Sequence, residues 1–421
     1  MASPKIIAAD QHYHCTDCGK CCRDWHVEVT AEEATELRAL RWDDGDHPPA
    51  KPVFRFQAKT FVSHRSDGTC VYFDTAAGNC RIHAKHGADA KPLGCRLYPL
   101  QFSRLASGQH ALSARADCPA VVAETGPLLS ASRKDAEKLL RSMPELPVPS
   151  KEDASTLTPD TVHVVLAALS AGILDADVPL RQKAIALNLA ASRLECLGAI
   201  FLNDKPIRDE VLETFFTRVL TDVPELRLRK QNIVEKWRYM SLLTTYLRRD
   251  EALIGGGLPA RIRNANALRK LTLGKGNLRE LDKDYPDGII GHLQLLGEPA
   301  AAPPAESAAR IVRLLKVRLQ TQQFYGSANF GLEFFEGLRS VALTVPLIVG
   351  AARWRALCEL RKTEINDADI QFGISAIDHS FGRMAVLRTP LFRILARQAW
   401  QPEAYARHIS AIIQDQTYDQ F

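Results

Sequence analysis

The chain has 421 residues, of which 46% are hydrophobic and 24% are charged, and its formal net charge is +5. This ordinary globular composition excludes a disordered chain and a collagen-like repeat, and the length suits about two or three domains. The longest apolar stretches, 164–174 and 341–352, run about a dozen residues, short of the roughly 20 that a membrane span needs. Because the N-terminus also lacks an apolar export signal, we expect a soluble, cytoplasmic protein with no membrane partner.

The first part of the chain, residues 1–125, is predicted to be an irregular, cysteine-rich metal-binding domain. Long periodic apolar runs are missing there, with one exception. Thr30 is followed by Glu33 in a capping-box pattern and then by Leu37 and Leu40, which predicts a helix that begins after Thr30.

Eight of the ten cysteines fall in the first 118 residues. A cytoplasmic chain keeps its thiols reduced, so a cluster of this kind indicates metal binding rather than disulfides. The predicted metal ligands are Cys15, Cys18, Cys21, Cys22, Cys70, Cys80, Cys95 and Cys118.

The densest motif, Y-H-C-T-D-C-G-K-C-C, places Cys15, Cys18 and Cys21 at two-residue gaps, with Gly19 free of side-chain strain in the turn. This spacing resembles the run that holds three irons of a [4Fe-4S] cluster, and Cys95 is our choice for the fourth ligand. Zinc is the alternative, because structural zinc also takes four thiolates and eight cysteines would suit two such sites.

Further cysteines follow in C-V-Y-F-D-T-A-A-G-N-C-R-I-H, P-L-G-C-R-L-Y-P and D-C-P. Over about residues 12–120, this order resembles the cysteine-cluster domain of the YkgJ type. The resemblance implies a zinc- or iron-chelating, iron–sulfur module. That family often has Tyr at the position of His83, so we interpret His83 as a packing residue and not as a ligand.

The remainder, 126–421, is predicted to be a large helical domain, because apolar residues recur there at three- and four-residue spacing. Breaks are predicted at 143–150, 254–259 and 297–307, and the last of these divides the domain into two halves. We expect Cys196 and Cys358 to pack inside helices as small core residues. The fold class is therefore mainly α.

The segment F-Y-G-S-A-N-F-G-L-E-F-F-E-G-L at 324–338, together with the order of the two domains, is similar to flagellin lysine N-methylases. The resemblance implies methyl transfer from S-adenosylmethionine to lysine side chains of flagellin or of a similar surface protein. The residues alone show no glycine-rich nucleotide loop after a strand, so they do not indicate where S-adenosylmethionine would bind. There are two alternatives. One is a metal-stapled binding module, which is a non-enzymatic protein whose metal only stabilises the N-terminal domain, and the other is an electron carrier.

Three side chains are candidate catalytic groups. Glu333 and Glu336 lie three apart on a predicted helix, which could turn one carboxylate inward beside Asn329 as a proton acceptor for lysine. His379 is a further acid–base candidate. The competing interpretation is that both carboxylates are solvated at a helix edge and that His379 belongs to the core.

Positive charge is concentrated between residues 227 and 279, a stretch that contains thirteen Lys or Arg and only three acidic residues. We expect this stretch to bind an acidic protein surface, although helices that face water often carry such an excess without a partner. Nucleic acid is not expected there, because Trp237, Tyr239 and Tyr246 are too few to form stacking platforms along a groove.

Overall fold

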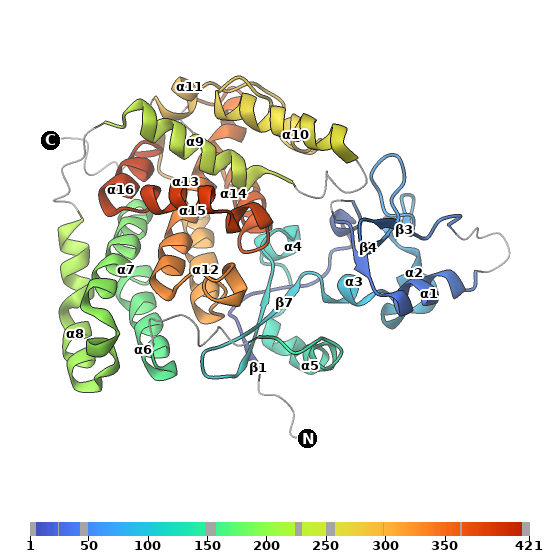
Figure 1. The fold of residues 1–421 in the computed structure, drawn as a ribbon, viewed down its shortest axis with the longest axis horizontal. Helices are drawn as coiled ribbons and strands as arrows, with labels where there is room; N and C mark the ends of the chain where they lie inside the picture. Colours follow the sequence, from blue (N-terminus) through green and yellow to red (C-terminus); the bar gives the residue numbers. More distant parts are fainter. Residues whose placement is uncertain are drawn as a thin grey trace.

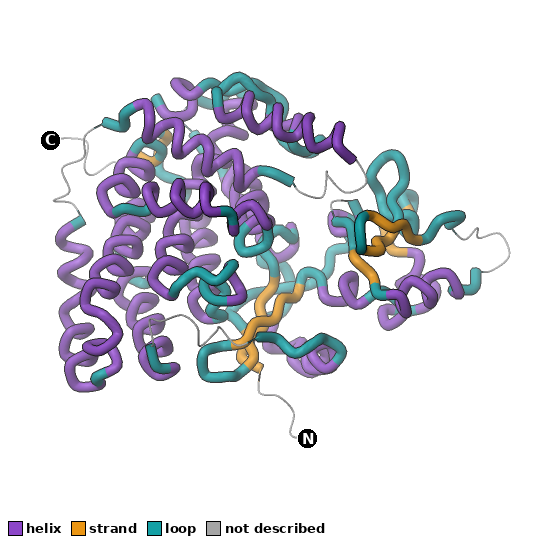
Figure 2. Tube along the Cα trace, in the orientation of Figure 1, coloured by secondary structure: helices purple, strands orange, loops and turns teal. Residues whose placement is uncertain are grey.

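The computed structural model describes residues 6–23, 25–42, 49–147, 157–223, 230–249, 257–297, 299–362 and 364–414. Figure 1 shows a small lobe beside a larger helical body, joined by a short sheet and the helices next to it. Strands lie mainly in the lobe and at this junction, whereas the body is built of helices (Figure 2). The prediction of a mainly α protein with an irregular N-terminal region is confirmed.

The small lobe contains an antiparallel sheet in the order β2 (Glu28–Val29), β4 (Lys59–Val62), β3 (Val53–Phe56), followed along the chain by the β5 (Phe73–Asp74) and β6 (Asn79–Cys80) hairpin. Its helices are α1 (Ala31–Ala39), α2 (Arg81–His86) and α3 (Leu93–Leu97). The core of the lobe is small, because it consists of few buried apolar side chains. These are Val27, Val29, Ala34, Leu37, Val62, Tyr72 and Ile82.

Helix α1 begins where the sequence predicts. The Thr30 hydroxyl accepts from the Glu33 amide at 3.2 Å, and the Glu33 carboxylate accepts from the Thr30 amide at 3.0 Å. The same carboxylate accepts from the Leu93 amide at 2.6 Å. The capping box therefore also fixes the start of α3, which carries Cys95.

The junction is a three-stranded sheet in which β8 (His110–Ala114) lies between β7 (Leu100–Arg104), antiparallel, and β1 (Ile6–Ala8), parallel. Helices α4 (Pro119–Val122) and α5 (Arg133–Arg141) follow it. The sheet is bonded to the body, since the Ser103 hydroxyl donates to the Thr321 carbonyl at 2.6 Å and the Gln323 amide donates to the Ser113 hydroxyl at 2.8 Å.

The helical body surrounds α13 (Phe334–Cys358), which packs against α14 (Asp367–Ser380) and α7 (Leu180–Asn203). Strand β9 (Ala300–Ala301) pairs with β10 (Ile413–Gln414), so the predicted break at 297–307 lies against the C-terminal segment. The predicted breaks at 143–150 and 254–259 fall partly outside the described residues. The other helices are α6 (Pro159–Leu169), α8 (Lys205–Asp222), α9 (Ile233–Leu247), α10 (Gly257–Thr272), α11 (His292–Leu296), α12 (Ala305–Gln320), α15 (Pro390–Ala399) and α16 (Pro402–Ser410).

Helix α13 continues through Pro346. Proline has no N–H, so the carbonyl of Ala342 loses its helical partner. The buried hydroxyl of Tyr405 donates to that carbonyl at 2.7 Å, and the hydroxyl of Tyr239 donates to the Pro346 carbonyl at 2.7 Å. Neighbouring helices therefore supply the hydrogen bond that proline removes and add another.

Two helices, α7 and α13, are long and apolar enough to cross a membrane by length and composition. Both helices are longer than the apolar stretches 164–174 and 341–352 that the sequence shows. In α13, 94% of the most apolar window is buried inside the protein, and in α7 50% is buried. The burial of α13 is that of a core helix.

The expectation that Cys196 packs in the core is wrong. Cys196 does lie in α7, but it is exposed. The helix is broken two residues later at Gly198, which has a φ of 80°, and the following turn leaves Ile200 85% exposed. Cys358 is partly buried at the end of α13, as expected for a packing residue.

Candidate metal centre

One cavity of about 760 Å³ lies where the lobe meets the junction, and most of the motif cysteines line it. The lining thiols are Cys15, Cys18, Cys21, Cys22, Cys80, Cys95 and Cys118. Cys70 does not line the cavity but lies next to a cysteine that does, since its amide donates to the Cys22 carbonyl at 2.7 Å. The structure thus brings together cysteines that are up to a hundred residues apart in the sequence.

The first four cysteines reach the cavity because the chain turns sharply at Gly19. Gly19 has a φ of 69°, which glycine adopts without strain, and it precedes the 3₁₀ turn Lys20–Cys22. A Cβ at Gly19 would lie 2.4 Å from the ring of Phe73. Both the backbone angle and the packing therefore require glycine in the C-G-K-C-C motif.

The later cysteines lie in short helices or directly before them. Cys80 ends the β5–β6 hairpin and precedes α2, and Cys118 precedes α4. Cys95 lies inside α3. His83, which we expected to pack, is exposed on α2 and lines the cavity, so the expectation that it packs is wrong. The short helix α2 leaves that face toward the cavity instead of toward the core.

Burial favours the protonated form of several of these thiols. It raises the pKa of Cys118 to about 11 and that of Cys70 to about 11, and the neighbouring Cys80 adds to the effect on Cys70. Burial also raises the pKa of Cys95, whereas the hydrogen bond with Cys22, and then burial, raise that of Cys21. Crowded thiols of this kind ionise when a metal cation replaces their protons, so the donor set suits a thiophilic metal.

As placed, the thiols share a cavity but do not form a closed ligand set. Among the described residues, no three His, Cys, Asp or Glu side chains are grouped closely enough to hold a metal ion. The four cysteines that the sequence assigns to one centre, Cys15, Cys18, Cys21 and Cys95, all line the cavity, and so do the cations Lys91 and Arg96.

A buried ionic network lies directly behind Cys118. The carboxylate of Asp117 accepts from Arg115 Nε at 3.1 Å, from the Tyr98 hydroxyl at 3.3 Å and lies 3.1 Å from His379 Nδ1. Burial alone would raise the pKa of Asp117, but Arg115 and then His379 hold it well below its usual value. Asp117 is therefore ionised and anchors the segment before Cys118.

The same segment is tied to helix α14 through Asp378. One carboxylate oxygen of Asp378 accepts from the Ala116 amide at 2.9 Å, and the other accepts from Arg318 Nη2 at 2.9 Å. The motifs in the sequence did not indicate a role for Arg115, Asp117 or Asp378. For Asp117 a signal was present, since it stands directly before the last cysteine in D-C-P.

The three candidate catalytic residues lie in different surroundings. His379 lines a narrow hollow together with Cys21 and Tyr98, next to the thiol cavity. Glu333 is exposed at the N-cap of α13. Glu336 is buried, with one carboxylate oxygen 2.6 Å from Arg397 Nε. Neither glutamate lines the thiol cavity or the hollow beside it.

The segment at 324–338 has a structural role in this fold. The side-chain amide of Asn329 is buried and donates to the Phe324 carbonyl and to the Ser340 hydroxyl, both at 3.1 Å. Asn329 therefore closes the loop before α13, and the partner of the Glu336 carboxylate is Arg397 and not Asn329.

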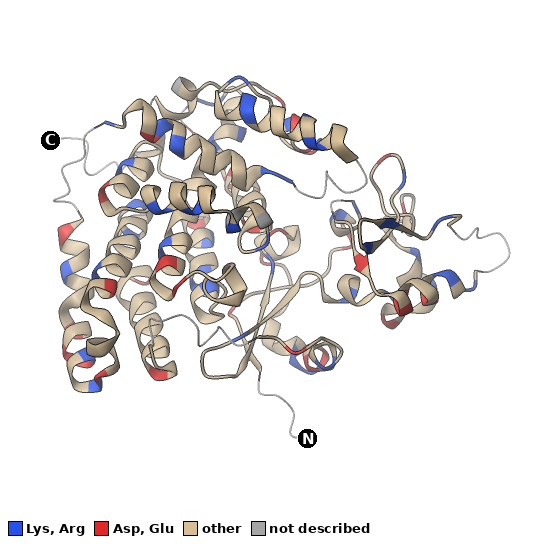
Figure 3. Cartoon of the chain, viewed as in Figure 1, with Lys and Arg blue, Asp and Glu red and all other residues tan. Residues whose placement is uncertain are grey.

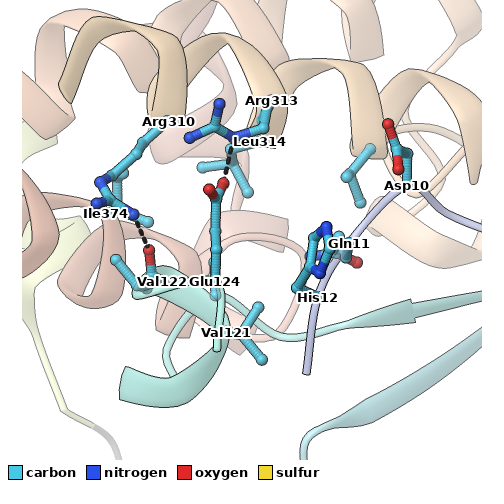
Figure 4. Close-up of a pocket in the computed structure, with 12 residues that line it drawn as sticks. Asp10, Gln11, His12, Val121, Val122, Glu124, Arg310, Arg313, Leu314 and Ile374 are labelled. Atoms are coloured by element: carbon cyan, nitrogen blue, oxygen red, sulfur yellow. Dashed lines mark hydrogen bonds and ion pairs between the residues drawn. The ribbon is translucent and has the colours of Figure 1, made fainter. Parts of the chain in front are cut away.

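Another cavity, of about 200 Å³, contains no thiol (Figure 4). Glu124 reaches across it to Arg313 of α12, while Arg310 donates to the Val122 carbonyl at 2.7 Å. The imidazole of His12 lies at its other end, where Nδ1 is 2.9 Å from the Gly126 carbonyl. These contacts join the junction to α12, and we assign no chemistry to them.

The basic stretch 227–279 is only partly a cationic surface. Arg227 and Arg229 lie outside the described residues. Arg249 and Lys270 form ion pairs with Asp282 and Glu280. Figure 3 shows basic residues along α10, and Arg261, Arg263 and Arg269 on this helix are exposed.

Comparison with known proteins agrees with this picture of the N-terminal region. Residues 14–119, about a quarter of the chain, match the family model CxxCxxCC, described as a "putative zinc- or iron-chelating domain". No curated protein and no solved structure matches the chain. The match supports the resemblance to the cysteine-cluster family and the prediction of a metal-binding domain.

Proposed function

We propose that the thiol cavity holds a [4Fe-4S] cluster. The observation that carries this proposal is that seven cysteines line one cavity of about 760 Å³, which is more donors and more space than one tetrahedral zinc ion uses. Two zinc ions are the alternative. Cys15, Cys18, Cys21 and Cys95 would hold the cluster, and Lys91 and Arg96 would offset its negative charge. When bound, such a cluster supplies an electron carrier or a Lewis acid.

Serine substitution at each of the eight cysteines tests this assignment. We expect loss of visible absorbance for the four proposed ligands and its retention for the others. Cys22→Ser is the matched control for Cys21→Ser, because the two residues share one turn and line the same cavity. Equal loss of absorbance at all eight positions contradicts the assignment.

For the activity, we propose transfer of a methyl group from S-adenosylmethionine to a lysine of flagellin or of a similar protein. The support is the resemblance of residues 324–338 and of the domain order. In this reaction the neutral lysine amine forms a bond to the methyl carbon, the sulfur–carbon bond breaks, and S-adenosylhomocysteine and one proton are released. His379, held by Asp117 next to Cys21, is our proposed acceptor of that proton. Glu333 and Glu336 are the less favoured acceptors.

Mass spectrometry of flagellin after incubation with the metal-loaded protein and S-adenosylmethionine tests the activity. We expect methylated lysines with the wild type and roughly 100-fold slower methylation with His379→Gln, as for loss of a general base. Slow methylation that is rescued by raising the pH would support the assignment of His379 as proton acceptor. Absence of methylation and of S-adenosylmethionine binding contradicts the methylase proposal.

A second proposal concerns the partner, and exposed side chains of α10 favour it. Arg261 and Arg263 are exposed beside Leu258 and Ile262, which are 69% and 60% exposed. We propose that this helix binds an acidic protein surface in the cytoplasm, as either a substrate or a binding partner. A metal-stapled binding module without enzymatic activity would use the same surface, so binding without methyl transfer favours that alternative.

A further inference from the structure

A cavity of about 310 Å³ lies between the metal-binding region and the helical body. The metal-binding side supplies Lys20 from the cysteine motif and Val122 from α4. The body supplies Arg249 at the end of α9, the loop at 282–285, and Phe372 with its neighbours on α14. This volume is at the lower end of the range of small-molecule sites, so it suits a ligand of amino-acid size or one end of a larger molecule.

This interdomain cavity lies next to the candidate metal centre. A narrow hollow of about 20 Å³ shares Cys21 and Tyr98 with the thiol cavity, and it shares Arg249 and Ser375 with the interdomain cavity. Lys20 lines all three. A molecule bound in the interdomain cavity is therefore separated from the thiols by little more than the Lys20 turn.

The walls carry charges of both signs. Lys20, Arg249 and Arg355 are cationic, whereas Asp282 and Asp284 are anionic. Arg249 Nε lies 3.3 Å from an oxygen of Asp282, and the Asp284 amide donates to the other oxygen of Asp282 at 3.0 Å. Asp282 and Asp284 therefore lie on one turn beside the guanidinium of Arg249.

Aromatic rings form a further wall. Tyr285 and Phe372 meet edge to face, with ring centroids 5.4 Å apart at 84°, and the guanidinium of Arg249 lies 5.2 Å from the centroid of Tyr285. The rings offer an apolar surface directly beside the charged groups. A ligand that fits all the walls therefore has a short apolar part next to its charges.

We propose that this cavity binds a zwitterionic aminocarboxylate. A phosphate or another pure anion would face Asp282 and Asp284, and a pure cation would face Lys20, Arg249 and Arg355. An α-amino acid group presents a carboxylate to the cations and an ammonium to the aspartates at the same time. The ligand is either a free amino acid or the methionine end of S-adenosylmethionine, and this second source rests on the proposed methylase function.

Calorimetric titration of the metal-loaded full chain tests the proposal with three probes. These are S-adenosylmethionine, L-methionine, and 5′-methylthioadenosine, which lacks the aminocarboxylate. We expect at least one of the first two to bind and the third not to bind. Asp284→Asn should weaken that binding by about tenfold or more, as for loss of a charged hydrogen bond. Asp284 is exposed, so this change leaves folding intact, and Asp287→Asn is the matched control because Asp287 lies outside the cavity and pairs with Arg279.

The outcomes separate the cavity from the methylase. Binding of S-adenosylmethionine that neither Asp284→Asn nor Phe372→Ala weakens overturns the cavity proposal and leaves the methylase standing. Binding of L-methionine that both variants weaken, without binding of S-adenosylmethionine, supports the cavity and contradicts the methylase. Binding of 5′-methylthioadenosine as tightly as S-adenosylmethionine, or binding of no aminocarboxylate, overturns the cavity proposal.

Discussion

The small lobe and the helical body obtain their stability from different sources. Among the described residues of the lobe, the core cluster contains seven buried apolar side chains, whereas the core of the body extends over nearly all of α13 and the helices around it. In the lobe, short strands and helices are arranged around a thiol-lined cavity; in the body, long helices are arranged around apolar side chains. We therefore expect the lobe to need a bound metal to remain folded, and the body to remain folded without one.

Cys118 lies where the two regions meet. Its own segment is bonded to the body through Asp117 and Asp378, while the other lining cysteines belong to the lobe or to the N-terminal segment. A metal centre that includes Cys118 or its neighbours would thus hold the lobe against the body as well as stabilise the lobe itself.

Removal of the metal, or Cys21→Ser, should have the largest effect, because a structural metal contributes on the order of 10 kcal/mol. We expect the lobe to unfold and the body to stay folded. Limited proteolysis should then cleave within residues 14–97 and spare the helices from α6 onward, while the helical circular dichroism signal largely persists. Simultaneous loss of both regions would show a single cooperative unit and break the comparison.

In the body, the largest effect is expected for Gly350→Ala. The new Cβ would lie 1.9 Å from the hydroxyl of Tyr239, which is fully buried and bonded to the Pro346 carbonyl. Overpacking together with loss of that hydrogen bond should lower the free energy of unfolding by about 2–4 kcal/mol in urea titrations. The double variant with Tyr239→Phe should recover part of the loss. Additive effects of the two changes would contradict the contact.

The stability of the body should also depend on pH through His408. Burial, and then Arg238, lower its pKa from 6.5 to about 4, so the folded state stays neutral while the unfolded state binds a proton. Stability is therefore complete above pH 6.5 and is lost as the pH falls toward 4, by up to about 3 kcal/mol. The free energy of unfolding of His408→Leu should lack this slope. An unchanged slope in this variant would show that His408 does not cause it.

A smaller loss is expected for Tyr405→Phe, about 1–3 kcal/mol, because the Ala342 carbonyl stays buried without a donor. Pro346→Ala restores a helical N–H for that carbonyl. In the Pro346→Ala background, Tyr405→Phe should therefore cost less than in the wild type, as measured by a double-mutant cycle. Equal costs in both backgrounds would show that Tyr405 does not replace the missing helical bond.

The smallest effect on stability is expected on the surface of α10. Reversing the charges of Arg261, Arg263 and Arg269 should change the free energy of unfolding by less than about 0.5 kcal/mol. Association with an acidic partner should become slower and less dependent on salt, while the metal spectrum stays unchanged. Tight binding of nucleic acid with a steep salt dependence would contradict the proposal of an acidic protein partner. It would indicate instead that α10 contacts a phosphate backbone.

The features that the sequence predicted are local ones. The capping box at Thr30 and the turn at Gly19 depend on residues that are neighbours in the chain, and the cysteines could be grouped by their motifs. The partners of Pro346 and of His379 could not be predicted, because Tyr405 and Asp117 come from distant segments. The exposure of Cys196 also depends on which helices cover α7, and periodicity does not contain that information.

The central claim is that the thiol cavity holds an iron–sulfur cluster, and metal analysis of the anaerobically purified full chain, together with its optical spectrum, tests it most directly. The account predicts a brown protein with broad visible absorbance, and iron and acid-labile sulfide in equal amounts, about four of each per chain. A colourless protein that contains one or two zinc ions and no sulfide would contradict it.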